Sequence, residues 1–308
     1  MNWDTALDGY WLARRRDLSV HTVRDYELTF RRFREFIGGG DVAVKAIKRA
    51  HVERFLNHLR DDLGLSAKTV GNHWIALSSF WSWAAEELRA PQVLHTVRRP
   101  VVRQRVVQPY SLEEVQRLLD ACVSMRAWSR RRAAHVAGAR PTAARDQALI
   151  LVLLDTGIRA AELSALRVRD FDRKQGRLTI WCGKGGKQRE VFLGQAAQRV
   201  LWRYLAERGE LASSAWLFAT SAGGEFDRLA LGNLLRRLGA RANVAGVGAH
   251  RFRHTFAINF LRNGGNLLAL QDILGHSTLA MVRRYARLAE VDIAAAQRGA
   301  SPADRWRL

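Results

Sequence analysis

The chain has 308 residues, enough for one large domain or two ordinary ones, and its 48% apolar content argues against disorder. Lysine and arginine number 50 against 29 acidic residues, and the resulting net charge of +21 points to a polyanion as partner. We expect a soluble, cytoplasmic protein that does not bind membranes, because no apolar run approaches the roughly 18 residues that span a bilayer and the amino-terminal residues lack the apolar stretch of a signal peptide.

Residues 1–95 are predicted to form four short helices, since apolar residues recur there with the helical period. The second helix begins after Ser19, a candidate N-cap, and the fourth begins after Ser66 and stops before Pro91. Aromatic residues share this period, which favours core positions over base-stacking platforms. The segment therefore indicates a small helical bundle.

Residues 96–109 are predicted to be a linker. They hold four arginines, two prolines and no acid, and proline and β-branched residues keep such a stretch extended. The charge suggests that the linker lies along a phosphate backbone, although a solvated basic tether is the alternative. The candidate contacts are Arg98, Arg99, Arg103 and Arg105.

Most of the positive charge lies after residue 95. Residues 1–95 hold 14 basic against 12 acidic residues, whereas residues 96–308 hold 36 against 17. A GC-rich genome that favours arginine codons is an alternative source of the 44 arginines beside 6 lysines, but it does not explain the shortage of acids. The second part is therefore expected to bind the polyanion, with a strong dependence on salt.

Residues 110–308 are predicted to be mainly helical with a small antiparallel β-sheet. Ser111 and Glu114 form a capping-box pattern, and an apolar helix over 146–155 leads to Gly157 as its C-cap. The β signal is a hairpin, RLTIW and QREVFL around the turn CGKGGK. Further helices are expected at 195–208, 229–242, 250–262, 266–274 and 278–289.

The cysteines predict no metal or disulfide chemistry. Cys122 and Cys182 are 60 residues apart in different predicted elements, and neither belongs to a CxxC motif. Both are predicted to be reduced thiols. The sequence also lacks a P-loop and a cluster of acidic metal ligands, so we expect neither a cofactor nor a metal.

Six side chains of the second part together can break a phosphodiester without a metal. Two guanidiniums can clamp the non-bridging oxygens, a lysine can protonate the leaving alkoxide, two imidazoles can move protons and a phenol can attack. These residues are Arg159, Lys184, His250, Arg253, His276 and Tyr285.

The first two of these residues also have plainer interpretations. Arg159, which follows TGI and precedes a short helix with Glu162, can be a capping or surface residue. Lys184 and Lys187, two of only six lysines, share one six-residue turn, where arginine would keep the charge but could not readily release a proton. A lysine retained there fits a general acid.

The other four residues depend on helix geometry. His250 and Arg253 are three apart, so they share a helix face. His276 and Tyr285 are nine apart and would lie about 180° from one another on one helix. We therefore expect Gly275 to end one helix and residue 277 or 278 to begin another. Arginines at 283, 284 and 287 flank Tyr285, which argues against a buried face for it.

The motifs TGIR, GKG, HRFRH and LGH, followed nine residues later by tyrosine, resemble the catalytic signature of the tyrosine recombinases, the phage-integrase family. Phe252 stands where leucine is commonest in the third motif, which is a conservative departure. The length resembles the compact Xer-type members. The resemblance implies a two-domain DNA clamp, with a helical, SAM-like core-binding domain at 1–95 and a catalytic domain at 110–308 that ends in a tail, 286–308.

The resemblance also implies a role for each residue. Tyr285 attacks the scissile phosphate and leaves a 3′-phosphotyrosine, while Arg159, Arg253 and His276 stabilise the charge on the phosphate. Lys184 protonates the 5′-oxygen, and His250 accepts the phenolic proton. We expect His254 to be structural. The further DNA-contact candidates are Lys187, Arg251, Arg283 and Arg284.

The implied partner is duplex DNA with inverted-repeat core sites, bound by a homotetramer at the nucleoid, with the tail docked on a neighbouring protomer. Two alternatives stay open, a type IB topoisomerase and a non-catalytic DNA-binding regulator. The sequence also leaves open the target site, the choice among integration, excision and dimer resolution, and the need for a second recombinase. The arginine-rich residues 126–145 can be an extra DNA contact or a loop.

Overall fold

The computed structural model describes residues 1–102, 107–123, 140–181, 188–276, 278–289 and 301. The chain divides into two compact units, Met1–Arg105 and Val106–Leu308, and the division falls inside the predicted linker. Lys184, Lys187, Arg103, Arg105, Cys182 and most of the arginine-rich segment and the tail lie outside the described residues. Each unit is described by itself.

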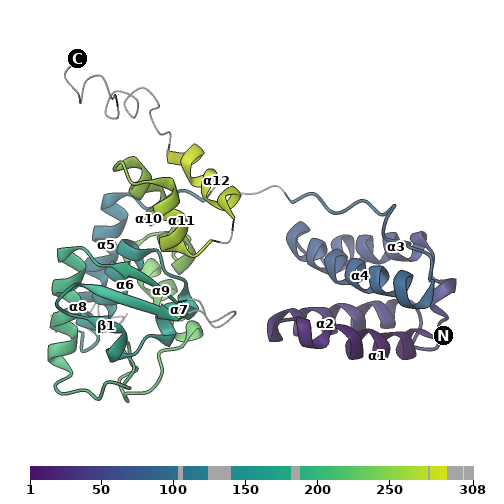
Figure 1. Cartoon of the computed structure of the whole chain (residues 1–308), viewed down its shortest axis with the longest axis horizontal. Coiled ribbons are helices and arrows are strands. Elements are labelled where there is room, and N and C mark those ends of the chain that lie inside the picture. Colours follow the sequence, from purple (N-terminus) through teal and green to yellow (C-terminus); the bar gives the residue numbers. More distant parts are fainter. Residues whose placement is uncertain (103–106, 124–139, 182–187, 277, 290–300, 302–308) are drawn as a thin grey trace, which may run out of the picture. The chain divides into compact units, whose positions relative to one another are not determined.

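The first unit has the four predicted helices around an aromatic core. Ser19 and Ser66 cap the second and fourth helices, since their hydroxyls accept hydrogen bonds from the amides of Thr22 and Thr69 at 3.1 and 3.2 Å. The core is a continuous cluster of rings, such as Trp3 and Phe80 with centroids 4.6 Å apart. The prediction that the periodic aromatics are core residues is confirmed. The helices, seen in Figure 1, are α1 (Trp3–Arg14), α2 (Val20–Phe36), α3 (Arg49–Asp61) and α4 (Ala67–Leu88).

The structure shortens the predicted linker at its first end and leaves the second end where it was predicted. Val97 is 4% exposed in the core of the first unit, and the indole of Trp74 donates a hydrogen bond to its carbonyl at 3.2 Å. On the other side, Tyr110 is buried, and its amide donates to the hydroxyl of Thr255 at 2.8 Å. Apolar side chains at these positions gain more from burial than from extension along the linker. Arg98 and Arg99 are exposed, as expected.

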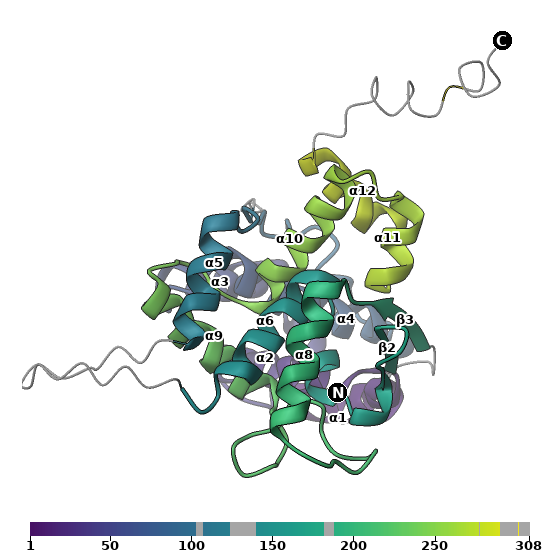
Figure 2. The same ribbon diagram turned by 90° about the vertical axis from the view of Figure 1, so that its left-hand side faces the viewer.

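The second unit has a mainly helical architecture with a three-stranded antiparallel sheet in the order β1-β2-β3. Figure 2 shows β2 and β3 side by side. Ser111 and Glu114 form the predicted capping box, with hydrogen bonds of 3.0 and 3.2 Å. The predicted hairpin is confirmed, with Thr179 opposite Glu190. The elements are α5 (Leu112–Val123), α6 (Ala143–Thr156), α7 (Ala160–Ala165), β1 (Phe171–Asp172), β2 (Arg177–Trp181), β3 (Gln188–Phe192), α8 (Gln195–Glu207), α9 (Arg228–Ala242), α10 (Ala249–Arg262), α11 (Leu267–Leu274) and α12 (Leu279–Ala289).

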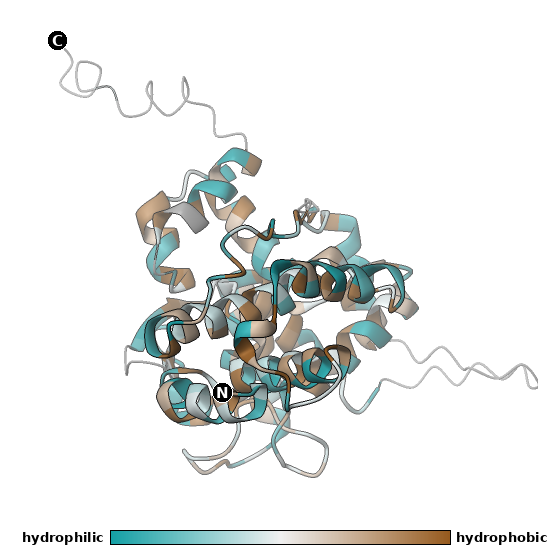
Figure 3. Ribbon diagram, turned by 90° about the vertical axis from the view of Figure 1, so that its right-hand side faces the viewer, coloured by the Kyte–Doolittle hydropathy of each residue, from teal (hydrophilic) through white to brown (hydrophobic). Residues whose placement is uncertain are grey.

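Two apolar cores form the interior of this unit. The larger core joins α5, α6, α8, α9 and the sheet, and the smaller one joins α10, α11 and α12. Polar and apolar residues alternate along the ribbons in Figure 3. Among the described helices, none is both long and apolar enough to cross a bilayer. The contact of α10 with both α6 and the α11–α12 pair brings the ends of these helices together.

Candidate active site

Two helices end in glycines that place backbone carbonyls beside α10. Gly157 ends α6 with φ +62°, and a Cβ there would lie 2.5 Å from the ring of Phe256. Gly275 ends α11 with φ +63°. Both residues take the left-handed conformation that glycine adopts without steric cost, as the sequence predicted. The last carbonyls of the two helices are therefore free to accept side-chain donors.

Three arginines converge on the C-terminal end of α11. Arg189 donates through Nε to the carbonyl of Ile273 at 2.7 Å, and Arg253 donates through Nη2 to that of Leu274 at 2.7 Å. Arg159 donates through Nη2 to the carbonyl of Gly275 at 3.2 Å. The negative end of a helix dipole and its unsatisfied carbonyls attract guanidinium groups. The arrangement concentrates positive charge at one point of the surface.

Glu162 joins two of these arginines. Its carboxylate accepts from Arg159 Nη1 at 2.8 Å and from Arg189 Nη1 and Nη2 at 3.0 and 2.7 Å. Burial would raise the pKa of Glu162, but the hydrogen bonds from Arg189 and from Arg159 lower that pKa to about 2. Glu162 is therefore ionised and fixes both guanidiniums.

Arg189 is a site residue that the sequence analysis missed. The signal was present, because Arg189 lies on the same face of β3 as the buried Val191, and a charge on the inward face of a strand needs a partner. Its partners, Glu162 and the end of α11, come from distant parts of the chain, so only the fold reveals them.

Arg253 is almost fully buried, and neutral acceptors hold its guanidinium. It is 4% exposed and donates through Nη1 to the carbonyl of Gly157 at 2.8 Å. Its Nη2 lies 2.6 Å from His276 Nε2. Burial, and then the charge of Arg159, lower the pKa of Arg253 to about 10. The group stays charged at neutral pH, and its hydrogen-bond partners among the described residues are two carbonyls and an imidazole.

His276 is neutral in this arrangement. A guanidinium can only donate, so Nε2 accepts and the ring proton resides on Nδ1. Burial, and then the nearby charges of Arg253 and Arg159, lower the pKa of His276 to about 4. Within the described part of the chain, Nδ1 is buried without a hydrogen-bond partner.

Tyr285 lies between two histidine rings. Its ring stacks at 22° on His276 with centroids 6.2 Å apart, and it meets His254 edge to face at 5.2 Å. Burial raises the pKa of the Tyr285 phenol, an effect that the charge of Arg253 opposes. The phenol is therefore protonated at neutral pH and needs a base to become a nucleophile.

The sequence argument against burial of Tyr285 was wrong. Tyr285 is 5% exposed and belongs to the small core, while Arg283, Arg284 and Arg287 are exposed. Adjacent helix positions point about 100° apart, so neighbouring charges say little about the face that one residue occupies.

His250 and His254 form a contact on α10. Their Nε2 atoms are 2.9 Å apart, so one ring donates and the other accepts. Burial, and then the charge of His250, lower the pKa of His254 to about 4, which keeps that ring neutral. His250 is exposed. His254 thus connects an exposed imidazole with the ring of Tyr285.

Arg251, a predicted DNA contact, is engaged in bonds within the second unit. Its guanidinium donates to the carbonyls of Gln108 and Ala245 at 3.0 and 2.8 Å and to Glu114 Oε2 at 2.6 Å, and it lies 4.0 Å above the ring of Tyr110. These acceptors occupy its fork, so Arg251 fastens the end of the linker to α10.

The structure brings together five of the six predicted catalytic residues: Arg159, His250, Arg253, His276 and Tyr285. Lys184 lies outside the described residues, between β2 and β3 in the sequence. Cys122 is a buried free thiol. No group of three or more metal-ligating side chains occurs in the described ranges.

Comparison with known proteins places both units in one family. Residues 111–291 match the Phage integrase family, and residues 7–87 match the phage integrase N-terminal SAM-like domain. Tyrosine recombinase XerD of Corynebacterium glutamicum is 30% identical over 301 residues, which cover 94% of this chain and 95% of the relative. Tyrosine recombinase XerC of Pelobacter propionicus is 27% identical over 281 residues, which cover 89% and 87%.

Solved structures share the fold. The Tn1549 transposon integrase in complex with circular intermediate DNA has a TM-score of 0.74 at 18% identity, covering 92% of this chain and 95% of that one. The post-cleavage complex of XerH site-specific recombinase with a palindromic difH substrate has a TM-score of 0.69 at 24% identity, covering 94% and 82%. With its family match over residues 111–291, its relative at 30% identity and its cluster of arginines, histidines and a tyrosine, the chain belongs to the phage integrase family and is a site-specific tyrosine recombinase.

Proposed function

We propose that this recombinase cleaves and rejoins duplex DNA through a 3′-phosphotyrosyl intermediate on Tyr285. The observation that carries the proposal is the position of the Tyr285 ring, against His276 and His254 and beside the buried charge of Arg253. A phenol in this position can attack a phosphate that the arginines hold.

Two guanidiniums can hold the phosphate. Arg159 is 44% exposed in its side chain, and Glu162 and the carbonyl of Gly275 engage only part of its five-donor fork. Arg253 contributes a positive charge whose hydrogen-bond partners among the described residues are neutral groups. Donors fixed before the reaction stabilise charge that develops on the non-bridging oxygens. His276, next to Arg253, is the third member of this group.

Two proton transfers complete the proposed reaction. His250 accepts the phenolic proton. It is the exposed member of the histidine pair, and its partner His254 contacts the ring of Tyr285. Lys184 protonates the departing 5′-oxygen, a role for which its titratable amine is suited. Since one phosphodiester is exchanged for another, the bond energy is conserved and no ATP is required.

We further propose that the substrate is duplex DNA with inverted-repeat core sites and that a homotetramer acts on the synapsed sites, in the cytoplasm at the nucleoid. The similarity to XerH bound to a palindromic substrate and to the Tn1549 integrase bound to DNA supports this proposal. Residues 1–95 would then be the core-binding part and 110–308 the catalytic part. Arg98, Arg99, Arg283 and Arg284 are exposed and remain candidate backbone contacts.

A covalent-trapping experiment tests the proposal. The protein is incubated with a nicked duplex from the DNA that flanks its gene, so that cleavage releases a short strand and traps the adduct. The unaltered enzyme is expected to give a protein–DNA band on a denaturing gel, and Tyr285→Phe is expected to give none while it binds the duplex with unchanged affinity.

Tyr26→Phe is the matched control, because it removes a phenol from the first unit and should leave the adduct unchanged. A persistent adduct in Tyr285→Phe would identify another nucleophile. Relaxed circles without recombinant products from a two-site plasmid would indicate topoisomerase activity instead.

A further inference from the structure

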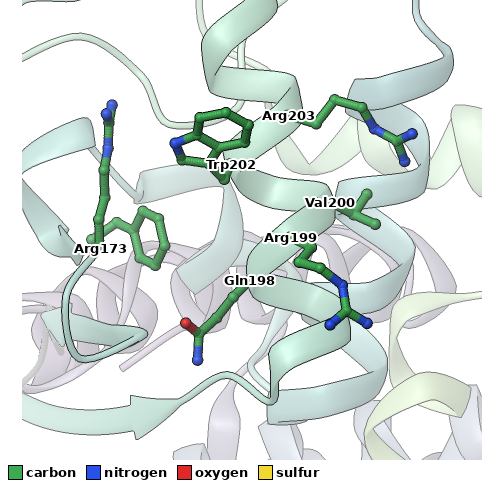
Figure 4. A pocket seen from close by; sticks show the side chains of 7 residues that line it. Arg173, Gln198, Arg199, Val200, Trp202 and Arg203 are labelled. Carbon is green, nitrogen blue, oxygen red and sulfur yellow. The ribbon is translucent and has the colours of Figure 1, made fainter.

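The second unit carries a hollow on the outer side of α8. It has a volume of about 580 Å³ and lies between α8 and the segment that joins β1 to β2 (Figure 4). We call it the α8 groove. Its lining consists of three buried or half-buried side chains and four exposed ones, with Arg173 on one side of Trp202 and Arg199 and Arg203 on the other. The less exposed residues are Phe171, Gln198 and Val200.

The inner wall of the α8 groove is preformed. Gly176 lies beside the end of the Gln198 side chain and has φ +64°, a backbone conformation that L side chains rarely adopt. Gln198 Nε2 donates to the carbonyl of Leu193 at 2.6 Å, which fixes its side chain. Phe171 is 8% exposed. A ligand would therefore meet a fixed surface and would not have to pay the conformational entropy of ordering it.

The exposed arginines of the α8 groove have no acidic partner in the described part of the chain. Trp202 is 59% exposed. Among the described residues, no ion pair or hydrogen bond joins Arg173, Arg199 or Arg203 to an acid, although Arg177 nearby binds both Asp172 and Glu190. Two arginines four apart on one helix repel each other. A single exposed aromatic residue is common on protein surfaces, but an exposed indole between unpaired guanidiniums beside a hollow is a specific combination.

The α8 groove is separate from the residues proposed to bind the scissile phosphate. Helix α8 packs on α6, and α6 in turn packs on α10, which carries Arg253. The groove also adjoins the start of β2, whereas the segment with Lys184 follows the end of β2 at Trp181. Its function therefore goes beyond DNA cleavage.

We propose that the α8 groove binds an acidic segment of a partner protein that carries one large apolar side chain. Carboxylates pair with guanidiniums in fork geometry, and the apolar side chain fills the hollow against Phe171 and Trp202. Tryptophan and arginine are the residue types that dominate the binding energy of protein interfaces. Duplex DNA offers phosphates to arginines but no projecting apolar side chain for the hollow, so a protein segment fits better.

The test uses the full chain and a short fluorescein-labelled peptide with one phenylalanine between two runs of glutamate. Fluorescence anisotropy is expected to show binding that Trp202→Ala weakens about tenfold or more, and that Arg203→Ala also weakens. Replacing the peptide phenylalanine by glycine should weaken binding as much as Trp202→Ala. DNA binding and covalent cleavage, measured on the same preparations, should be unchanged in both variants.

Two variants serve as controls. Phe192→Ala removes a ring that is 60% exposed on β3 and does not line the hollow, and Arg262→Ala removes an exposed guanidinium from the end of α10. Neither should change peptide binding. The proposal is overturned if no Trp202-dependent binding occurs up to about 1 mM peptide, or if the peptide without phenylalanine binds equally well. Loss of DNA affinity in Trp202→Ala would instead show that the α8 groove binds DNA.

Discussion

The charge of Arg253 is held in an unusual way for a buried arginine. Most buried cations pair with a carboxylate, which neutralises them. Arg253 instead donates to two carbonyls and faces a neutral imidazole, while Glu162 compensates Arg159 and Arg189. The arrangement fixes the guanidinium in position and leaves its charge available to a bound phosphate.

Arg253→Lys distinguishes the effect of the positive charge from the effect of the guanidinium geometry. Lysine keeps the charge but cannot reach both helix ends with a planar fork, so we expect the single-turnover cleavage rate to fall by about 10²-fold or more. Arg253→Ala also leaves the carbonyls of Gly157 and Leu274 without donors and should lower the unfolding free energy by about 1–3 kcal/mol. Urea denaturation and quenched cleavage assays measure the two effects. Arg262→Lys, at the exposed end of the same helix, is the control. An equal loss of cleavage rate in Arg262→Lys would show that Arg253 has no special role in cleavage.

The neutral histidines predict a pH dependence of stability. The pKa of His254 and that of His276 are both lowered from 6.5 to about 4, so the unfolded chain binds protons that the folded chain does not. The resulting stabilisation is fully present above about pH 6.5 and is lost as the pH falls towards 4. The buried His73 of the first unit behaves in the same way.

The measurement is the unfolding free energy between about pH 6.5 and pH 5, above the range in which ordinary carboxylates titrate. His254 alone should contribute a slope of up to about 1.4 kcal/mol per pH unit. His254→Gln should therefore flatten the pH dependence, whereas His21→Gln, at an exposed position, should not. An unchanged slope in His254→Gln would mean that this ring is protonated in the folded chain.

At the scale of elements, α10 is fastened to the end of the linker. Arg251 binds the carbonyl of Gln108 and the carboxylate of Glu114, and the hydroxyl of Tyr110 accepts from the amide of Gly248, the N-cap of α10, at 3.0 Å. The helix that carries His250 and Arg253 is thus bound directly to the segment that leads from the first unit.

Arg251→Ala tests this structural role against the DNA contact expected from the sequence. We expect a loss of about 1.5–3 kcal/mol in unfolding free energy, typical of hydrogen bonds to charged groups, and a coupling with Glu114→Gln in a double-mutant cycle. The salt dependence of DNA affinity should be unchanged. Arg284→Ala, at an exposed position, should instead reduce the log–log salt slope by about 0.9. A reduced salt slope in Arg251→Ala would show that Arg251 does contact DNA.

The sequence predicted the elements whose signals are local. Serine caps, helical periodicity and glycine C-caps located the helices, and the hairpin followed from two alternating strands around a glycine-rich turn. Strand β1 was missed because two residues carry no periodicity. The meeting of Arg159, Arg189 and Arg253 at the end of α11 was not predictable, because each carbonyl acceptor depends on tertiary packing.

At the scale of the whole molecule, we expect the tail, residues 286–308, to link the chain into an assembly. Helix α12 ends at Ala289, which is 4% exposed in the same small core as Tyr285, and the family resemblance implies that the tail beyond it docks on a neighbouring protomer. Because α12 carries the nucleophile, docking of the following residues would couple the position of Tyr285 to assembly.

Truncation after Ala289 tests this coupling and leaves α12 intact. If the tail docks in trans, the truncated protein should bind a single core site with nearly full affinity but should fail to pair two sites and to recombine them. Gel shifts with one-site DNA and recombination assays with two-site DNA measure the two properties, and the full-length protein at equal concentration is the control. Full recombination by the truncated protein would exclude a trans role. Loss of single-site binding would show instead that the tail supports its own catalytic unit, since a segment required for one protomer to bind DNA acts before any assembly forms.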